Sequence, residues 1–267
     1  MQPETFIHPE TGRVTIYAVA NQKGGVGKTT TCVNTAVCLA EAGATVLLVD
    51  IDPQCNATHG VGCGETPHDF SIYDVLVNDV SVELATVPTQ SPHLYLLPST
   101  PDLVGAEVEL PLRERREYIL SEGLRPFSVN FDYVFIDCPP SLSLLTVNAL
   151  VAADRLIIPV QCEYYALEGL GHLLQTFKAV KGSLNQRLKI DGLIMTMSDN
   201  RTRLSSDVIA EVRSHFPELT YKTIIPRNVK LSEAPSFGKP INFYDKNSIG
   251  AKKYEEFAQE FLGETQN

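Results

Sequence analysis

The residues best suited to chemistry lie in a glycine- and lysine-rich segment near the start of the chain, which reads KGGVGKTT over positions 23–30. In the usual phosphate-binding loop, G-x-x-x-x-G-K-[ST], backbone N–H groups surround the phosphates, the lysine supplies a cation and the hydroxyl binds Mg²⁺. Gly27, Lys28 and Thr29 fit the second half of this pattern. Gln22 stands where the first glycine should be, and a second lysine, Lys23, follows it. The segment therefore predicts a nucleoside-triphosphate site of a variant type.

Three aspartates follow apolar, strand-like runs further along the chain. Asp50 ends one run and Asp52 comes two residues later, whereas Asp137 ends another. A bound Mg²⁺ with its water shell is a reason for such carboxylates to meet. A structural alternative stays open at this point, because Asp50 and Asp137 could cap strand ends and Asp52 could be a turn residue before Pro53.

The elements that must position these residues alternate between strands and helices. Residues 28–42 carry apolar side chains at Val33, Ala36, Val37 and Ala40, which form one face of a helix. Further helices are expected over 112–123, 142–152, 166–181, 203–215 and 249–262. Strands are expected over 14–20, 45–50, 94–97, 133–137, 155–160, 190–196 and 223–225. This alternation predicts an α/β fold of the P-loop NTPase type, a mostly parallel twisted sheet with helices on both faces and ligands beyond the carboxyl ends of the strands.

The bulk composition fits one large domain. The chain has 267 residues, of which 43% are hydrophobic. We expect a single domain over 14–267 after a flexible lead over 1–13, which does not read as a secretory signal. The apolar runs are strand-length and fall short of the roughly 18 residues that a membrane helix needs. The six cysteines form no C-x-x-C pair, which favours buried thiols in a reducing cytosol.

Charge is distributed unevenly along the chain. The whole chain carries a net charge of −10, whereas residues 201–253 carry 10 Lys and Arg against 5 Asp and Glu. A polyanion contacts one surface of a protein, so the local charge of that surface matters more than the net charge of the whole chain. The basic stretch is therefore compatible with contacts to DNA phosphates without base readout. The alternative is an ordinary solvated helix face. The cations of interest are Arg201, Arg203, Arg213, Lys222, Arg227 and Lys230.

Five segments resemble the motifs of a known family. Segment 20–31 (ANQKGGVGKTTT) looks like the deviant Walker A motif of the ParA/MinD superfamily, 49–54 (VDIDPQ) like its Walker A′ motif and 134–141 (VFIDCPPS) like its Walker B motif. Segments 158–163 (IPVQCE) and 225–240 (IPRNVKLSEAPSFGKP) resemble the chromosomal partition ATPases ParA/Soj. The resemblance covers nearly all of residues 14–260.

The resemblance implies a role for each motif residue in a slow, Mg²⁺-dependent ATPase. Lys23 would be the signature lysine that reaches the partner's nucleotide across a sandwich dimer, Lys28 would hold the β- and γ-phosphates, and Asp52 would position the attacking water. These three are the expected catalytic residues. The expected metal-site residues are Thr29, Asp50 and Asp137. The expected nucleotide-binding residues are Lys23, Gly24, Gly25, Val26, Gly27, Lys28, Thr29, Thr30, Pro226 and Asn228.

The resemblance also implies partners. The ATP-bound homodimer would bind double-stranded DNA nonspecifically, and a ParB-type centromere-binding protein would stimulate hydrolysis and release the DNA. The protein would then be cytoplasmic and associated with the nucleoid, without a membrane partner. The expected DNA contacts are Arg201, Arg203, Arg227 and Lys230, with Arg201 favoured because lysine at position 230 lacks the planar fork of arginine.

Three other functions remain as alternatives. A MinD-type division-site ATPase would need a basic amphipathic C-terminal helix to bind a membrane, whereas this chain ends in a glutamate-rich segment, 255–264. An iron–sulfur electron donor would need a second ligand loop to match Cys138, with Cys162 as a weaker candidate. A tyrosine autokinase would need a cluster of tyrosines near the end, where Tyr254 stands alone.

Overall fold

The computed structural model describes residues 14–164, 166–199 and 201–265. Within these residues the chain forms an eight-stranded sheet in the order β3-β4-β2-β5-β1-β6-β7-β8. All neighbouring strands are parallel except β3 and β4, which are antiparallel. The prediction of an α/β fold with a mostly parallel sheet is confirmed. The strands are β1 (Thr15–Val19), β2 (Val46–Asp50), β3 (Val87–Pro88), β4 (Leu94–Leu97), β5 (Tyr133–Asp137), β6 (Arg155–Gln161), β7 (Lys189–Ser198) and β8 (Thr220–Pro226).

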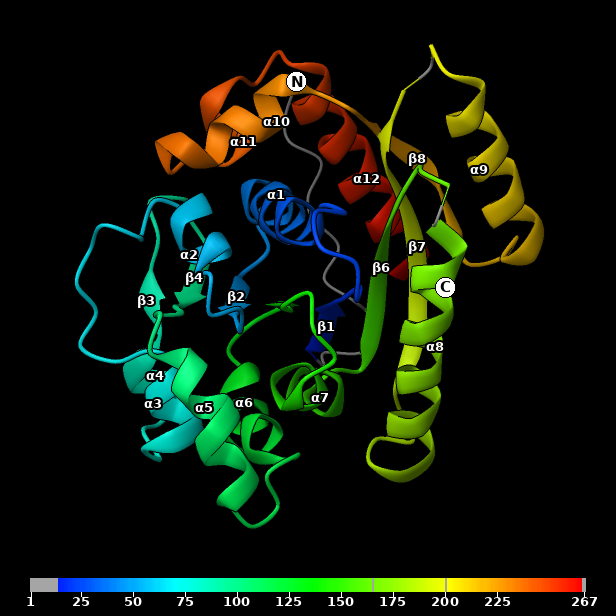
Figure 1. Cartoon of the computed structure of the whole chain (residues 1–267). Coiled ribbons are helices and arrows are strands. Elements are labelled where there is room, and N and C mark those ends of the chain that lie inside the picture. Colours follow the sequence, from blue (N-terminus) through cyan, green and yellow to red (C-terminus); the bar gives the residue numbers. More distant parts are fainter. Residues whose placement is uncertain (1–13, 165, 200, 266–267) are drawn as a thin grey trace.

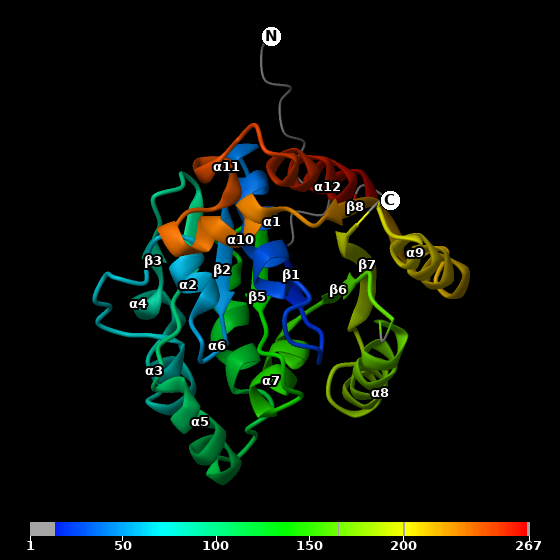
Figure 2. The ribbon, with the colours of Figure 1, turned by 45° about the horizontal axis from the view of Figure 1, so that its top comes forward.

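Helices cover both faces of this sheet (Figures 1 and 2). α1 and α12 pack on one face, and α7 and α8 pack on the other. The helices are α1 (Lys28–Glu41), α2 (Asn56–Gly60), α3 (Ile72–Val77), α4 (Val82–Ala85), α5 (Leu103–Glu109), η1 (Leu110–Leu112), α6 (Ile119–Ser128), α7 (Leu144–Ala152), α8 (Ala166–Ser183), α9 (Arg203–His215), α10 (Val229–Glu233), η2 (Ala234–Phe237), α11 (Ile241–Tyr244) and α12 (Ile249–Thr265).

The central strands are apolar on both faces because helices bury both of them. Every residue of β2 and β5 is buried, and alternate residues of each strand join the two core clusters on opposite sides of the sheet. The parallel register pairs Asp50 with Asp137 as direct neighbours. β2 and β5 therefore bring two carboxylates that are 87 positions apart in the sequence to one point at the carboxyl edge of the sheet.

One predicted helix begins later than expected. Residues 112–123 were expected to be helical, but α6 begins at Ile119 and continues to Ser128. Arg115 has φ of 53°, in the left-handed region that a right-handed helix cannot contain. Gly123 does not end the helix, because it lies inside α6 where an added Cβ would be 3.4 Å from Val82. That glycine provides room for packing between α6 and α4.

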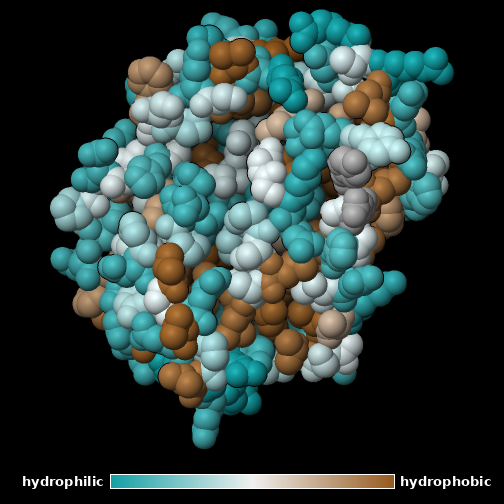
Figure 3. All heavy atoms as spheres, in the orientation of Figure 1, coloured by the Kyte–Doolittle hydropathy of each residue, from teal (hydrophilic) through white to brown (hydrophobic). Residues whose placement is uncertain are grey.

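Two features lie at the periphery. The sheet ends at the short antiparallel strand β3. Its Pro88 has no N–H to donate to a neighbouring strand, and proline is therefore found at sheet edges. Hydrophobic side chains show over α5 and α7 on the lower part of one face (Figure 3), and Val104 and Val108 of α5 are exposed. The predicted flexible lead, 1–13, lies outside the described residues.

Candidate functional site

The glycine-rich loop joins β1 to α1 and is fixed by side chains from neighbouring elements. Asn21 donates through Nδ2 to the Pro159 carbonyl at 2.7 Å and accepts from the Lys23 N–H at 3.1 Å. Thr196 Oγ1 of β7 donates to the Val26 carbonyl at 2.8 Å. Gly27 has φ of 87° where α1 begins, a conformation that suits glycine. The loop thereby holds a fixed shape at the N-terminus of α1, where backbone N–H groups favour anions.

Lys28 is a buried cation at the base of this loop. Lys28 is only 6% exposed, and its Nζ donates to the Lys23 carbonyl at 3.2 Å. Burial lowers the pKa of Lys28, while the charges of Asp137 and Asp52 act in the opposite direction. A buried ammonium group is stabilised by any anion that reaches it, so a phosphate at this point is held strongly.

Asp50 and Asp137 are both fully buried, but only Asp50 is satisfied by hydrogen bonds. Asp50 accepts from the Thr58 N–H and from Thr58 Oγ1, each at 2.8 Å, and from the Asp52 N–H at 3.1 Å. Burial raises the pKa of Asp50 to about 6 against these hydrogen bonds. Asp50 is therefore a rigid member of the site with its orientation set by α2.

Asp137 is the carboxylate without a partner. Neither of its oxygens accepts a hydrogen bond from any residue that the structure describes. Burial and the neighbouring charge of Asp50 raise its pKa well above the usual range, and the Thr29 hydroxyl and Lys28 offset only part of this. An unpartnered buried carboxylate is costly, and a hydrated divalent cation beside Thr29 would supply the missing donors. The residues present therefore fit Mg²⁺ bound through a hydroxyl and an outer carboxylate shell.

Asp52 lies at the rim of the same site. It is nearly buried, Oδ1 accepts from the Gln54 N–H at 2.9 Å, and its backbone carbonyl accepts from Ser99 Oγ at 2.8 Å. These contacts fix the loop after β2 with the Asp52 side chain in the wall of the cavity. A carboxylate in this position can orient a water molecule above a phosphate.

A cavity of about 660 Å³ opens over these residues, large enough for a nucleotide. Of the predicted site residues, it includes Gly24, Gly25, Gly27, Lys28, Thr29, Thr30 and Asp52. The remaining lining residues are Val33, Asn34, Gln54, Asn56, His59, Gly60, Pro140, Met197, Leu231, Ala234, Pro235, Ser236, Lys239, Pro240 and Ile241.

Four predicted nucleotide-binding residues lie outside this lining. Val26 is buried within the loop, and Lys23 points away to Glu163 at 3.1 Å. Pro226 ends β8, and Asn228 caps α10 by accepting from the Lys230 N–H at 2.9 Å. The structure therefore brings the phosphate and carboxylate residues together and leaves these four at its margins.

The wall opposite the loop was predicted only in part, because the resemblance of segment 225–240 pointed to Pro226 and Asn228 and not to the residues that line the cavity. It is built by α2 and by the segment from α10 to α11, which the strand and helix patterns did not reveal. Asn34 of α1 joins this wall to the loop, because its Nδ2 donates to the Thr30 carbonyl at 2.7 Å and its Oδ1 accepts from the Ile241 N–H at 2.8 Å. In the sequence, the signal for this contact is Asn34 itself, a polar residue among the apolar positions of α1.

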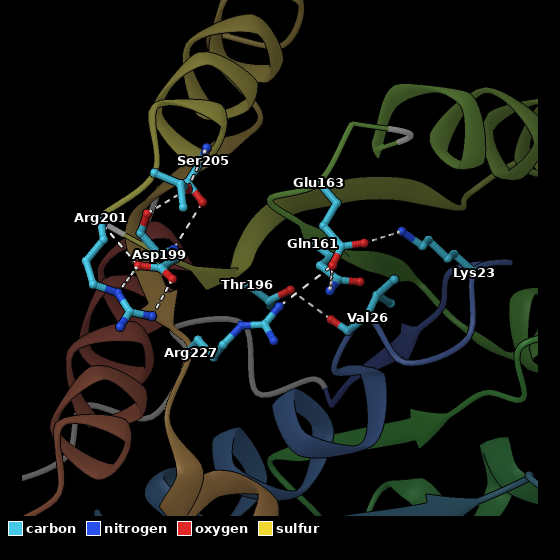
Figure 4. A network of polar contacts seen from close by, with 10 residues as sticks. Lys23, Val26, Gln161, Glu163, Thr196, Asp199, Arg201, Ser205 and Arg227 are labelled. Carbon is cyan, nitrogen blue, oxygen red and sulfur yellow. Dashed lines mark hydrogen bonds and ion pairs between the residues drawn. The ribbon is translucent and has the colours of Figure 1, made fainter.

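The predicted DNA-contacting residues form exposed ion pairs. Arg201 pairs with Asp199 at 2.7 Å (Figure 4) and strongly lowers the pKa of that carboxyl, chiefly through a side-chain hydrogen bond. The other three follow the same pattern: Arg203 pairs with Asp207 at 3.6 Å, Arg227 with Glu163 at 3.7 Å and Lys230 with Glu233 at 2.9 Å. The cations of these pairs are exposed, so a polyanion can compete with the carboxylates for them.

Two further findings bear on the alternative functions. All six cysteines are unpaired and buried, and the described residues contain no group of three or more Cys, His, Asp or Glu side chains that could hold a metal ion. No helix in the described part of the chain is long and apolar enough to span a membrane.

The chain is similar to known proteins over most of its length. The AAA domain family matches residues 14–190. The sporulation initiation inhibitor protein Soj of Bacillus subtilis is 53% identical over 245 residues, which cover 92% of this chain and 97% of that protein. The chromosome partitioning protein ParA of Myxococcus xanthus is 49% identical over 247 residues, 92% of this chain and 87% of that protein.

A solved structure gives the same result at the level of the fold. The structure described as cobyrinic acid a,c-diamide synthase from Mycobacterium smegmatis, with bound ATP analog and magnesium, is 40% identical. It has a TM-score of 0.80 and covers 92% of this chain and 93% of that chain. The ParA and Soj relatives confirm the resemblance carried by the sequence motifs. The chain belongs to the ParA/Soj family of chromosome-partitioning ATPases.

Proposed function

We propose that the protein is a DNA-segregation ATPase whose ATP-bound dimer holds DNA nonspecifically and releases it when a ParB-type partner stimulates hydrolysis. The observation that carries the proposal is the unpartnered Asp137 carboxylate, which is buried and acts electrostatically on Lys28, a residue that lines a nucleotide-sized cavity. A site that only stabilised the fold would not leave a buried charge unpaired. The names of the relatives, ParA and Soj, support the same function.

The residues of the site divide the work of hydrolysing ATP to ADP and phosphate. When it is bound, Mg²⁺ neutralises phosphate charge. Thr29 would hold the ion through its hydroxyl, and Asp50 and Asp137 would accept hydrogen bonds from the water molecules bound to it. Lys28 binds the β- and γ-phosphates at the N-terminus of α1, and Asp52 orients the water that attacks the γ-phosphate. Hydrolysis is slow, because the dimer must persist until a partner acts.

Dimer formation depends on Lys23. Two ATP molecules that face each other across a two-fold axis repel, and a lysine from each protomer offsets this repulsion only when both protomers close. Lys23 is 34% exposed as a side chain at the rim of the loop, within reach of a facing molecule. ATP thus acts as the switch between monomer and dimer.

The dimer binds DNA through the phosphate backbone. Arg201, Arg203, Arg227 and Lys230 lie in exposed ion pairs whose carboxylates DNA phosphates can replace. Dimerisation doubles the number of these cations on one assembly, which strengthens binding and steepens its salt dependence. The protein therefore works in the cytoplasm on the nucleoid, and a ParB-type centromere-binding protein ends each cycle by stimulating hydrolysis.

Sedimentation velocity tests this proposal. The full chain is run without nucleotide and with ADP, ATP or a nonhydrolysable analogue, each with and without random-sequence double-stranded DNA. We expect a dimer with ATP and with the analogue, co-sedimentation with DNA in those states only, and loss of hydrolysis in EDTA. A chain that stays monomeric under all of these conditions would overturn the proposal, and co-sedimentation with anionic vesicles instead of DNA would redirect it to a membrane.

A further inference from the structure

Glu163 connects the nucleotide loop to the basic residues. Its Oε2 forms an ion pair with Lys23 Nζ at 3.1 Å, and its Oε1 lies 3.7 Å from Arg227 Nη2 (Figure 4). Gln161 Nε2 donates to the same Oε1 at 2.6 Å. Among the ion pairs formed by the described residues, Glu163 is the only carboxylate that holds two cations. Segment 158–163 contains Glu163, and the proposed function gives it no role.

The two oxygens of this carboxylate have different neighbours. Gln161 and Arg227 engage Oε1, so they fix the plane of the group, and Oε2 is left to face the glycine-rich loop. Both supporting residues are anchored to the sheet, because Gln161 ends β6 and the Arg227 N–H donates to the Ser198 carbonyl of β7 at 2.9 Å. Lys23 therefore meets a carboxylate that is already oriented toward it.

We propose that Glu163 is a positioning residue that holds Lys23 away from the nucleotide in the free protomer, so that dimerisation must break this pair. The inference rests on the proposed function, because it takes Lys23 to be the lysine that binds the facing nucleotide. In the structure, the Lys23 side chain is directed to Glu163, and Lys23 is absent from the lining of the cavity.

The ion pair between Lys23 and Glu163 is weak enough to break when the dimer forms. The side chains of Lys23 and Glu163 are 34% and 44% exposed, so water screens their attraction. A triphosphate carries more charge than one carboxylate and can take the lysine when a facing protomer brings it close. Exposed pairs of this kind shift an equilibrium by about threefold, and each dimer must break two of them, so the expected total is roughly tenfold.

The test measures the dimer dissociation constant at saturating nonhydrolysable ATP analogue and Mg²⁺ by sedimentation over a range of protein concentrations. Glu163→Gln keeps the shape of the side chain and removes its charge. We expect about tenfold tighter dimerisation, with the nucleotide affinity of the dilute monomer and the thermal unfolding midpoint unchanged. Glu163→Asp, which keeps the charge on a shorter side chain, is expected to lie between the wild type and Glu163→Gln.

Glu233→Gln is the matched control. Glu233 pairs with Lys230 at 2.9 Å, its side chain is 40% exposed, and its removal changes the net charge equally. It should leave the dimer constant at the wild-type value. Equal tightening in the control would assign the effect to net charge and overturn the inference, as would unchanged or weaker dimerisation in Glu163→Gln. A wild-type chain that never dimerises would overturn the proposed function as well, which separates the two failures.

Discussion

At the scale of single residues, the site is defined by an imbalance between two neighbouring carboxylates. Asp50 has three hydrogen-bond donors around it, whereas Asp137, its direct neighbour across β2 and β5, has none among the described residues. Burial acts on both groups, and it raises the pKa of both. The difference implies that Asp50 is built into the fold and that Asp137 is kept for a ligand.

Asp137→Asn is expected to stabilise the ligand-free protein and to abolish hydrolysis. Because its pKa is raised in the folded state, the carboxyl destabilises the fold above its unfolded pKa of about 3.9, and the neutral amide removes this penalty. We expect a gain of about 1–3 kcal/mol in the free energy of unfolding at pH 7, which disappears near pH 3. Urea unfolding in EDTA measures it.

Asp50→Asn provides the comparison for this experiment. The amide replaces one acceptor oxygen with a donor that faces the N–H and hydroxyl groups of Thr58, so we expect a loss of about 1–3 kcal/mol. Equal effects of the two substitutions would contradict the assignment of different roles to the two carboxylates.

Arg201→Glu is expected to keep ATP-dependent dimerisation and to abolish DNA retention. The substitution replaces a phosphate contact with a like charge, next to Asp199. Gel shift at low salt measures the loss. Arg115→Glu is a suitable control, because Arg115 is also exposed and ion-paired but lies between η1 and α6, so its replacement should leave retention intact. Unchanged retention in Arg201→Glu would count against the basic set, which comprises Arg201, Arg203, Arg227 and Lys230, as the DNA contact.

At the scale of elements, the cavity depends on a close approach between two loops. The loop after α2 meets the end of η2 at Gly62 and Gly238, where a Cβ on Gly62 would lie 2.8 Å from the Gly238 carbonyl oxygen. α2 and η2 both supply lining residues, so this backbone contact sets the distance between the two parts of the wall opposite the glycine-rich loop.

Gly62→Ala is therefore expected to weaken nucleotide binding as well as the fold. Gly43→Ala isolates the backbone contribution, because Gly43 has φ of 102° with no atom within 4 Å of an added Cβ, while Gly62 has φ of 82°. We expect Gly43→Ala to lose about 1 kcal/mol of unfolding free energy, and Gly62→Ala to lose more because its Cβ also clashes with the Gly238 carbonyl oxygen. Only Gly62→Ala should raise the dissociation constant for the ATP analogue, measured by calorimetry, and equal affinities in the two variants would contradict this account of the wall.

The length of a helix or strand decided whether it could be predicted from the sequence. Most of the long alternating segments lie within a few residues of their expected bounds, and 203–215 matches α9 at both ends, whereas the helix expected over 112–123 is displaced to α6. The short elements α2, α10 and α11 escaped notice, because helices of four or five residues carry no complete period of apolar side chains. Their stability comes from packing against α1 and η2, which sequence patterns do not record.

At the scale of the whole molecule, the net charge of −10 and the exposed cations are compatible because they concern different surfaces. Each cation of the basic set is partly neutralised in the single protomer by a neighbouring carboxylate. A single copy therefore offers DNA a weak surface. We expect useful affinity only when two copies are joined, and the salt dependence should reflect the number of phosphates neutralised.

Lys23→Ala tests this dependence on assembly. The variant keeps Lys28 and the cavity, so we expect it to bind ATP as a monomer, to fail to dimerise and to lose DNA retention although the basic set is intact. Sedimentation and filter binding measure the two properties together. Lys178→Ala, which removes an equal charge from an exposed position of α8, should behave as the wild type. DNA retention by a monomeric Lys23→Ala protein would show that assembly is not required.

The sequence by itself determined the sheet, the helices that cover it and the positions of Lys28, Asp50, Asp52 and Asp137 at strand ends, because local periodicity and strand polarity suffice for these. Only the tertiary structure decided which carboxylate is satisfied, since Thr58 of α2 donates to Asp50, whereas no described residue donates a hydrogen bond to Asp137. It also decided that Lys23 rests on Glu163, 140 positions away. Contacts over such separations depend on register and side-chain orientation, which no local pattern encodes.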